Sequence, residues 1–99
     1  MEFVIVEDDR ATRAELIDIV QQSGDWELAG EADSLRRARW LLGKRADLWM
    51  VDLGLPDGSG LELIREVREL NSSRCKIVVI TMFADEANVI SAIKAGADG

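Results

Sequence analysis

Apolar residues along this chain are grouped into four short segments separated by longer, mixed stretches. Three of the segments, residues 3–6, 48–51 and 76–81, are apolar with almost no alternation, which indicates strands covered on both faces of a sheet. The remaining segment, residues 26–32, lies between the first two of these in the chain and alternates apolar residues with glutamates. This pattern is typical of a strand with one wetter face, often at the edge of a sheet.

Each predicted strand is followed by a stretch whose apolar residues recur at helical spacing. The expected core-facing residues are Ala14, Leu16, Ile17 and Val20 in the first stretch, Leu35, Ala38, Leu41 and Leu42 in the second, Leu63, Ile64, Val67 and Leu70 in the third, and Val89, Ile90 and Ile93 in the fourth. Asp9 and Ser34 are placed as N-caps, and Gly96 as a C-cap. Trp40 is expected to pack against the rest of the fold. Strands alternating with helices predict a parallel sheet with helices on both faces, the doubly wound α/β class.

The composition is that of one small acidic domain. The 99 residues are 47% hydrophobic, which is enough for a single core, and the net charge is −7. That charge argues against binding of nucleic acid or of an anionic membrane by this chain. The main basic cluster is expected to be a solvated face, with a partner surface as the alternative. It consists of Arg36, Arg37, Arg39, Lys44 and Arg45.

Cysteine content and the first residues bear on the compartment. A single cysteine, Cys75, excludes an internal disulfide and suits a reducing environment. The chain opens directly with a predicted strand and shows neither a secretory leader nor an apolar run of membrane-spanning length. We therefore expect a cytoplasmic protein.

The strand predicted at residues 48–51 delivers a carboxylate, Asp52, to a segment rich in turn residues. Turn chemistry and a helix start follow in the order Pro56, Asp57 and Gly58, then Ser59 and Glu62 with the spacing of a capping box. Asp57 is expected to bond to its local backbone, and Gly58 to permit a positive φ. Asp52 is thus predicted at the carboxyl end of a strand in a strand-loop-helix unit, where open α/β sheets bind their ligands.

Polar residues also end two other predicted strands, and a parallel sheet brings them to the same edge as Asp52. Glu7 and Asp8 follow the first strand, and Thr81 ends the last. Carboxylates gathered in this way repel one another unless a cation or a proton intervenes. Oxygen ligands in a chain without histidine indicate a hard ion such as Mg²⁺.

The chemistry open to such a site is phosphoryl transfer. A carboxylate beside a metal ion can attack phosphorus and form an acyl phosphate. The lack of histidine excludes a Ser-His-Asp triad. Other acids, Asp9, Asp57 and Asp85, are expected to be helix caps or solvated loop residues.

Four motifs in register resemble the receiver domain of two-component response regulators. They are VIVEDD at residues 4–9, VDLGLPDGSGLEL at 51–63, VVITMF at 78–83 and AIKAGADG at 92–99, and together they cover the chain from end to end. The segments GEADS, DLGLPDGSGLEL and TMFADE resemble those of the subgroup whose members carry a C-terminal, LuxR-type helix-turn-helix domain. The resemblance implies a flavodoxin-like sheet with strand order 2-1-3-4-5.

The resemblance also implies a role for each site residue. Asp52 matches the phospho-acceptor, and Glu7 and Asp8 match the acidic pair that organises Mg²⁺, with Asp8 as the direct ligand. The Gly54 carbonyl matches the backbone ligand of the metal, and Thr81 the hydroxyl that binds the phosphoryl oxygen and moves on activation. The donor would be a histidine kinase. The output would be transcription regulation through a DNA-binding domain that is not part of residues 1–99.

Residues 1–99 match the family only as far as the start of its fifth strand. The resemblance therefore implies a receiver domain that is incomplete at its C-terminus, without the family's fifth strand, fifth helix and lysine; Lys94 does not match that lysine. The strand at residues 77–81 is then expected to be an unpaired edge, open to a homodimer or a strand-exchanged oligomer. Gly54 and Met82 leave the lifetime of the phosphorylated state open.

Two other functions fit the same residues. One is an interaction module with the same fold that takes no phosphate and binds no Mg²⁺. The other is a Mg²⁺-dependent phosphohydrolase, which would need a second acid two residues after Asp52, where this chain has Gly54. A receiver domain is a phospho-acceptor in signalling and not an enzyme, apart from its own phosphorylation and dephosphorylation. The sequence does not identify the kinase, the stimulus or the target genes.

Overall fold

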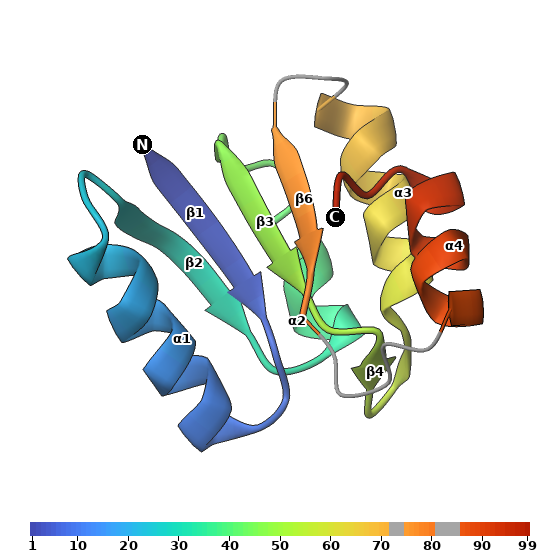
Figure 1. The fold of residues 1–99 in the computed structure, drawn as a ribbon, viewed down its shortest axis with the longest axis horizontal. Helices are drawn as coiled ribbons and strands as arrows, with labels where there is room; N and C mark the ends of the chain where they lie inside the picture. The colour runs from blue at the N-terminus through green and yellow to red at the C-terminus, as the bar shows by residue number, and fades with distance from the viewer. Residues whose placement is uncertain (72–74, 81–85) are drawn as a thin grey trace.

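A computed structural model describes residues 1–71, 75–80 and 86–99 of the chain (Figure 1). The parallel sheet contains β1 (Glu2–Val6), β2 (Glu27–Ala32), β3 (Leu48–Val51) and β6 (Lys76–Val79), in the order β2-β1-β3-β6. The helices are α1 (Arg10–Gln22), α2 (Leu35–Arg39), α3 (Gly60–Asn71) and α4 (Glu86–Ala95). A short hairpin joins β4 (Gly54–Leu55) to β5 (Gly58–Ser59). The predicted parallel α/β class is confirmed, and the alternating strand β2 lies at the edge of the sheet as expected.

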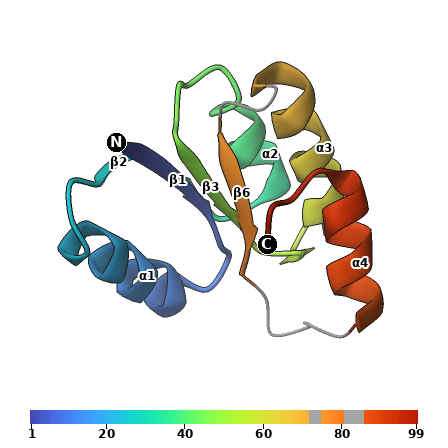
Figure 2. The same ribbon diagram turned by 45° about the horizontal axis from the view of Figure 1, so that its top comes forward.

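Helices cover both faces of the sheet. Helix α1 lies on one face, and α2, α3 and α4 lie on the other (Figures 1 and 2). Within the described part of the chain, no helix combines the length and the apolar composition needed to cross a membrane. The arrangement agrees with the continuous apolar runs of β1 and β3, whose residues after the first are all buried. In β6 only Ile77 is buried, and Val78 and Val79 are half-buried, so the expectation of a strand covered on both faces is met only in part there.

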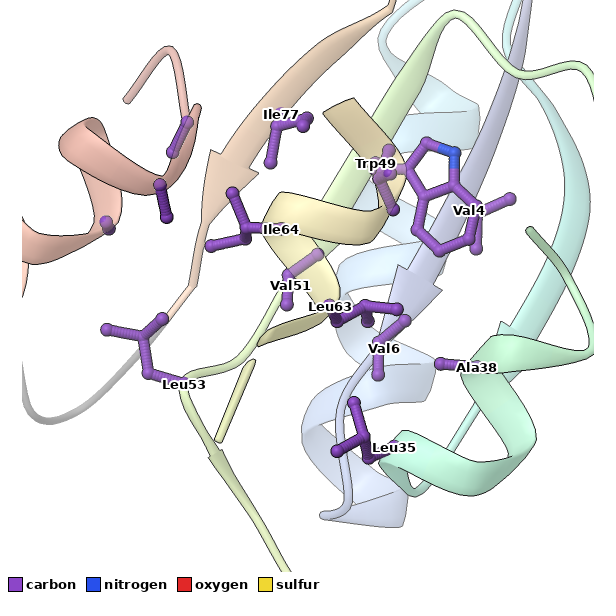
Figure 3. Close-up of a cluster of buried hydrophobic side chains, with 14 of the residues drawn as sticks. Val4, Val6, Leu35, Ala38, Trp49, Val51, Leu53, Leu63, Ile64 and Ile77 are labelled. Atoms are coloured by element: carbon purple, nitrogen blue, oxygen red, sulfur yellow. The ribbon is translucent and has the colours of Figure 1, made fainter. Parts of the chain in front are cut away.

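The main core lies between the sheet and the helices α2, α3 and α4 (Figure 3). The sheet contributes Val4, Val6, Trp49, Val51 and Ile77, and the helices contribute Leu35, Ala38, Leu63, Ile64 and Val67. Since side chains alternate along a strand, Phe3, Ile5 and Met50 point to the opposite face, toward α1. The side chain of Phe3 meets Trp26 edge-on there, with ring centroids 6.4 Å apart.

Several predicted core positions are exposed instead. Trp40 is 82% exposed, so the prediction that it packs against the fold is wrong. Helix α2 ends at Arg39, and the chain continues in tight turns that carry Trp40 outward while Leu41 and Leu42 pack partly against the core. Leu70, Ile90 and Ile93 are also exposed, and α1 has no fully buried residue. Helical spacing located these helices but overestimated the width of their buried faces.

The predicted caps are present, with one difference. The Asp9 carboxylate accepts the Thr12 N–H at 2.8 Å, and the Ser34 hydroxyl accepts the Arg37 N–H at 3.1 Å. Gly96 has a φ of +123° and follows the last turn of α4, where glycine is favoured. The Ser59 hydroxyl caps α3 through the Leu61 N–H at 3.1 Å, and not through Glu62 as the capping-box spacing predicted.

The free edge predicted for the last strand is partly paired. Val79 N–H donates to the Gly99 carbonyl at 2.6 Å, and Asp98 N–H donates to the Ile77 carbonyl at 2.7 Å. The Asp98 carboxylate also accepts the Ile77 N–H at 2.8 Å and pairs with Arg68 of α3 at 2.8 Å. The expectation of an unpaired edge is therefore wrong for this part of β6.

Candidate functional site

Three of the predicted site residues meet at the carboxyl ends of β1 and β3. These strands are parallel neighbours, with Val6 opposite Val51, and the Asp52 N–H donates to the Val6 carbonyl at 2.9 Å. One carboxylate oxygen from each of Glu7, Asp8 and Asp52 lies within 4.8 Å of the others. The sheet topology thus brings together residues that are far apart in the sequence.

Asp52 is held by the turn that follows it. Its side chain is buried, and Oδ1 accepts the Gly54 N–H at 3.1 Å. The first residue of α3 crosses directly over the Asp52 backbone, because a Cβ placed on Gly60 would lie 2.2 Å from the Asp52 carbonyl oxygen. The Gly60 N–H also donates to the Leu53 carbonyl at 3.0 Å. Only glycine fits where α3 begins against the end of β3.

The β4–β5 hairpin is anchored to α2 by Asp57. Its two carboxylate oxygens accept the N–H groups of Leu35 at 2.7 Å and Arg36 at 2.9 Å. These bonds hold the pKa of Asp57 below its usual range, with the Arg36 bond contributing most. A bond from the backbone of Asp57 itself acts in the same direction, in line with the predicted local bond. The expectation that Asp57 is a helix cap is also met, although the helix it caps is distant in the sequence. Gly58 is not in the positive-φ region, and its importance is steric, since a Cβ there would lie 2.7 Å from the Leu35 side chain.

Glu7 has a strongly raised pKa. Burial raises its pKa from 4.5 to about 7, and the neighbouring side chains of Asp8 and Asp52 act in the same direction. The Asp9 N–H, which donates to Glu7 Oε2 at 3.1 Å, opposes the shift. Crowded carboxylates in a buried position favour a bound proton when no cation is present.

The raised pKa of Glu7 predicts that the metal-free protein loses stability as the pH rises from about 4.5 to about 7. In this window folded Glu7 keeps its proton while unfolded Glu7 loses it, so the folded state binds more protons and is disfavoured by increasing pH. The expected loss from this residue is at most about 3 kcal/mol. Urea unfolding at several pH values with a chelator present measures it. Glu7→Gln should remove this part of the decline, and an identical pH profile in that variant would contradict the prediction.

The donor set fits a magnesium ion. The cluster offers three carboxylates and, in the part of the chain that the structure describes, no nitrogen or sulfur ligand joins them. Oxygen-only sites of this kind bind hard divalent cations. The Gly54 N–H donates to Asp52, so Gly54 lies next to the cluster. The role of its carbonyl as a metal ligand stays a prediction. Thr81 lies outside the described residues.

Sequence reasoning missed one residue of the site, Arg13. Its Nη1 donates to the Glu7 carbonyl at 2.8 Å, and its Nε pairs with Glu31 Oε1 at 2.8 Å. The side chain is only 16% exposed, although arginine usually lies at the surface. The pattern of apolar positions gave no signal for Arg13, because a half-buried arginine in a helix cannot be distinguished by sequence from a solvated one.

Comparison with known proteins identifies the family. The model of the response regulator receiver domain matches residues 3–99. The KDP operon transcriptional regulatory protein KdpE of Escherichia coli is 38% identical over 96 residues, which cover 96% of this chain and 41% of that protein. The chemotaxis protein CheY of Thermotoga maritima is 35% identical over 95 residues, which cover 95% of this chain and 78% of that protein. The chain therefore spans less than half the length of KdpE.

Solved structures agree with this assignment. The crystal structure of a response regulator protein from Burkholderia pseudomallei, which holds a phosphorylated aspartic acid, a calcium ion and citrate, matches with a TM-score of 0.88. Its sequence is 28% identical, and the match covers 98% of this chain and 56% of that chain. The predicted flavodoxin-like fold and the family inferred from the motifs are confirmed. The chain belongs to the receiver domains of two-component response regulators.

Proposed function

We propose that Asp52 accepts a phosphoryl group from a histidine kinase and that Mg²⁺ is held by Glu7, Asp8, Asp52 and the Gly54 carbonyl. The convergence of three carboxylates at the ends of β1 and β3 carries this proposal. The phosphorylated aspartic acid and the calcium ion of the Burkholderia pseudomallei structure support it by similarity. The transfer would break the bond between phosphorus and the kinase imidazole nitrogen and form one from phosphorus to an Asp52 oxygen.

The residues of the chain prepare Asp52 for this step in two ways. The Gly54 N–H fixes the carboxylate through Oδ1, and the close approach of Gly60 fixes the backbone behind it. A bound Mg²⁺ would supply positive charge to offset the three carboxylates and the phosphoryl oxygens. Positioning and charge neutralisation are the main requirements of phosphoryl transfer, which needs little covalent assistance from the protein.

The output we propose is regulation of transcription by a DNA-binding domain outside this chain. KdpE is a transcriptional regulatory protein, and DevR/DosR of Mycobacterium tuberculosis, 31% identical over 97 residues, is a DNA-binding transcriptional activator. We assign Thr81 as the hydroxyl that binds the phosphoryl oxygen, on the strength of its motif alone. Self-association of the chain stays a prediction that analytical ultracentrifugation can test, although residues 98–99 already pair with part of the β6 edge.

Acetyl phosphate and MgCl₂ test the phospho-acceptor directly. We expect intact-mass spectrometry to show one added phosphoryl group, peptide mapping to place it on Asp52, and a chelator to prevent it. Calorimetric titration with MgCl₂ reports the metal site separately. A chain that binds Mg²⁺ but is labelled on another residue would overturn the assignment of Asp52. A chain that binds no Mg²⁺ and takes no phosphate would instead be an interaction module with a receiver fold.

A further inference from the structure

Arg13 joins three elements directly beside the acidic cluster. It is the fourth residue of α1, donates through Nη1 to the Glu7 carbonyl just after β1, and donates through Nε to Glu31 on β2. Both bonds are 2.8 Å long, and the side chain is 16% exposed. An arginine with two short, separate bonds in a largely buried position has one defined orientation.

The peptide that Arg13 holds is the one that precedes Asp8. The Glu7 N–H donates to the Ala32 carbonyl at 3.0 Å, so β2 restrains one side of Glu7 and Arg13 restrains the other. The Glu7 side chain accepts the Asp9 N–H at 3.1 Å. The orientation of the Glu7–Asp8 peptide determines the direction in which the Asp8 side chain leaves the backbone. Arg13 is the only side chain that bonds to this carbonyl among the hydrogen bonds of the described residues.

We propose that Arg13 is a positioning residue for the cation site: through the Glu7 carbonyl it sets the geometry of Glu7 and Asp8, and Glu31 orients its guanidinium. This inference rests on the proposed function, because it concerns the same metal site. Arg13 on α1 and Glu31 on β2 would thus support cation binding without being ligands of the cation themselves.

Charge and positioning predict effects of opposite sign, which makes the inference testable. Arg13 is a cation close to a site for a cation, so by charge alone its removal would strengthen Mg²⁺ binding. If Arg13 positions the ligands, its removal weakens Mg²⁺ binding in spite of the gain in negative charge. Loss of such supporting contacts commonly lowers metal affinity about tenfold or more.

The test is calorimetric titration of the whole chain with MgCl₂, at a temperature where every variant is folded. We expect Arg13→Ala to raise the Mg²⁺ dissociation constant about tenfold. Arg37→Ala is the matched control, because Arg37 lies near Arg13 but pairs with Asp33 at 3.5 Å. It removes the same charge without touching the Glu7 carbonyl and should leave the affinity equal or slightly tighter. An Arg13→Ala variant that binds Mg²⁺ as tightly as the wild type, or more tightly, would overturn the inference.

Hydrogen exchange without metal tests Arg13 independently of Mg²⁺. Arg13→Ala is expected to lose protection at the amides of Glu7 and Asp9, while the amides of β3 and α3 keep theirs. Unchanged exchange at residues 7–9, or a uniform loss over the whole sheet, would show that Arg13 does not act locally on this segment. If the wild type binds no Mg²⁺ while the local loss is observed, the metal assignment fails and the positioning contact stands.

Discussion

Alanine in place of Gly60 is expected to destabilise the protein by more than about 3 kcal/mol. The added Cβ would lie 2.2 Å from the Asp52 carbonyl oxygen and 3.0 Å from both the Asp52 carbonyl carbon and the Leu53 Cα. All three contacts are backbone atoms, which cannot rotate away as the end of a flexible side chain can. The substitution must therefore separate the start of α3 from the end of β3.

Chemical denaturation measures this effect, and Gly43→Ala is its control. A Cβ on Gly43 would meet no atom within 4 Å, so that substitution should change the free energy of unfolding by less than about 1 kcal/mol. Because Gly60 contacts the backbone of Asp52, any folded Gly60→Ala protein should also be phosphorylated more slowly by acetyl phosphate. Equal stability of the two alanine variants would contradict the close approach seen in the structure.

Replacement of Asp52 by asparagine is expected to abolish phosphorylation completely while the fold is retained. Asparagine has nearly the shape of aspartate, and its side-chain oxygen can still accept the Gly54 N–H. It has no carboxylate to attack phosphorus, so no acyl phosphate can form. Removal of one of three crowded charges should also relieve the repulsion on Glu7, whose raised pKa has Asp52 among its causes. The metal-free variant is therefore expected to be at least as stable as the wild type.

Intact-mass spectrometry after incubation with acetyl phosphate and MgCl₂ measures the loss of labelling, and urea unfolding at pH 7 measures the stability. Asp18→Asn is the matched control, because it makes the same chemical change on the exposed surface of α1. It should be labelled as fast as the wild type. Full labelling of the Asp52→Asn variant would exclude Asp52 as the acceptor. Unfolding of that variant at room temperature would contradict the expected relief of repulsion.

Much of the fold could be predicted because its signals are local. The unalternating apolar runs predicted β1, β3 and β6, and the alternating run predicted an edge strand. The caps of Asp9 and Ser34 depend on a bond to a backbone N–H three residues later, which sequence spacing reports directly. The meeting of Glu7, Asp8 and Asp52 required one more step, the rule that the carboxyl ends of parallel strands share an edge.

Other features could not be predicted because they depend on how the elements pack. Trp40 and Trp49 are the same residue type in predicted elements, yet one is 82% exposed and the other is fully buried. Helical spacing predicts the direction of the Trp40 side chain only if the helix continues through that residue, and α2 ends at Arg39. The sequence predicted a helix cap or a solvated loop residue at Asp57, and only the docking of the hairpin on α2 shows which helix it caps.

The sequence by itself determined the order of strands and helices, the family and the carboxylates that meet at one edge of the sheet. The order of the elements and the meeting of the carboxylates follow from periodicity, short-range hydrogen bonds and a general rule of topology, whereas the family was indicated by motifs that resemble known receiver domains. The tertiary structure alone decided that Gly60 must lack a side chain, that Asp57 binds α2 and that Arg13 holds the Glu7 peptide. Each of these requires atoms of separate elements to approach within a few ångströms, and no spacing along the chain encodes such a distance.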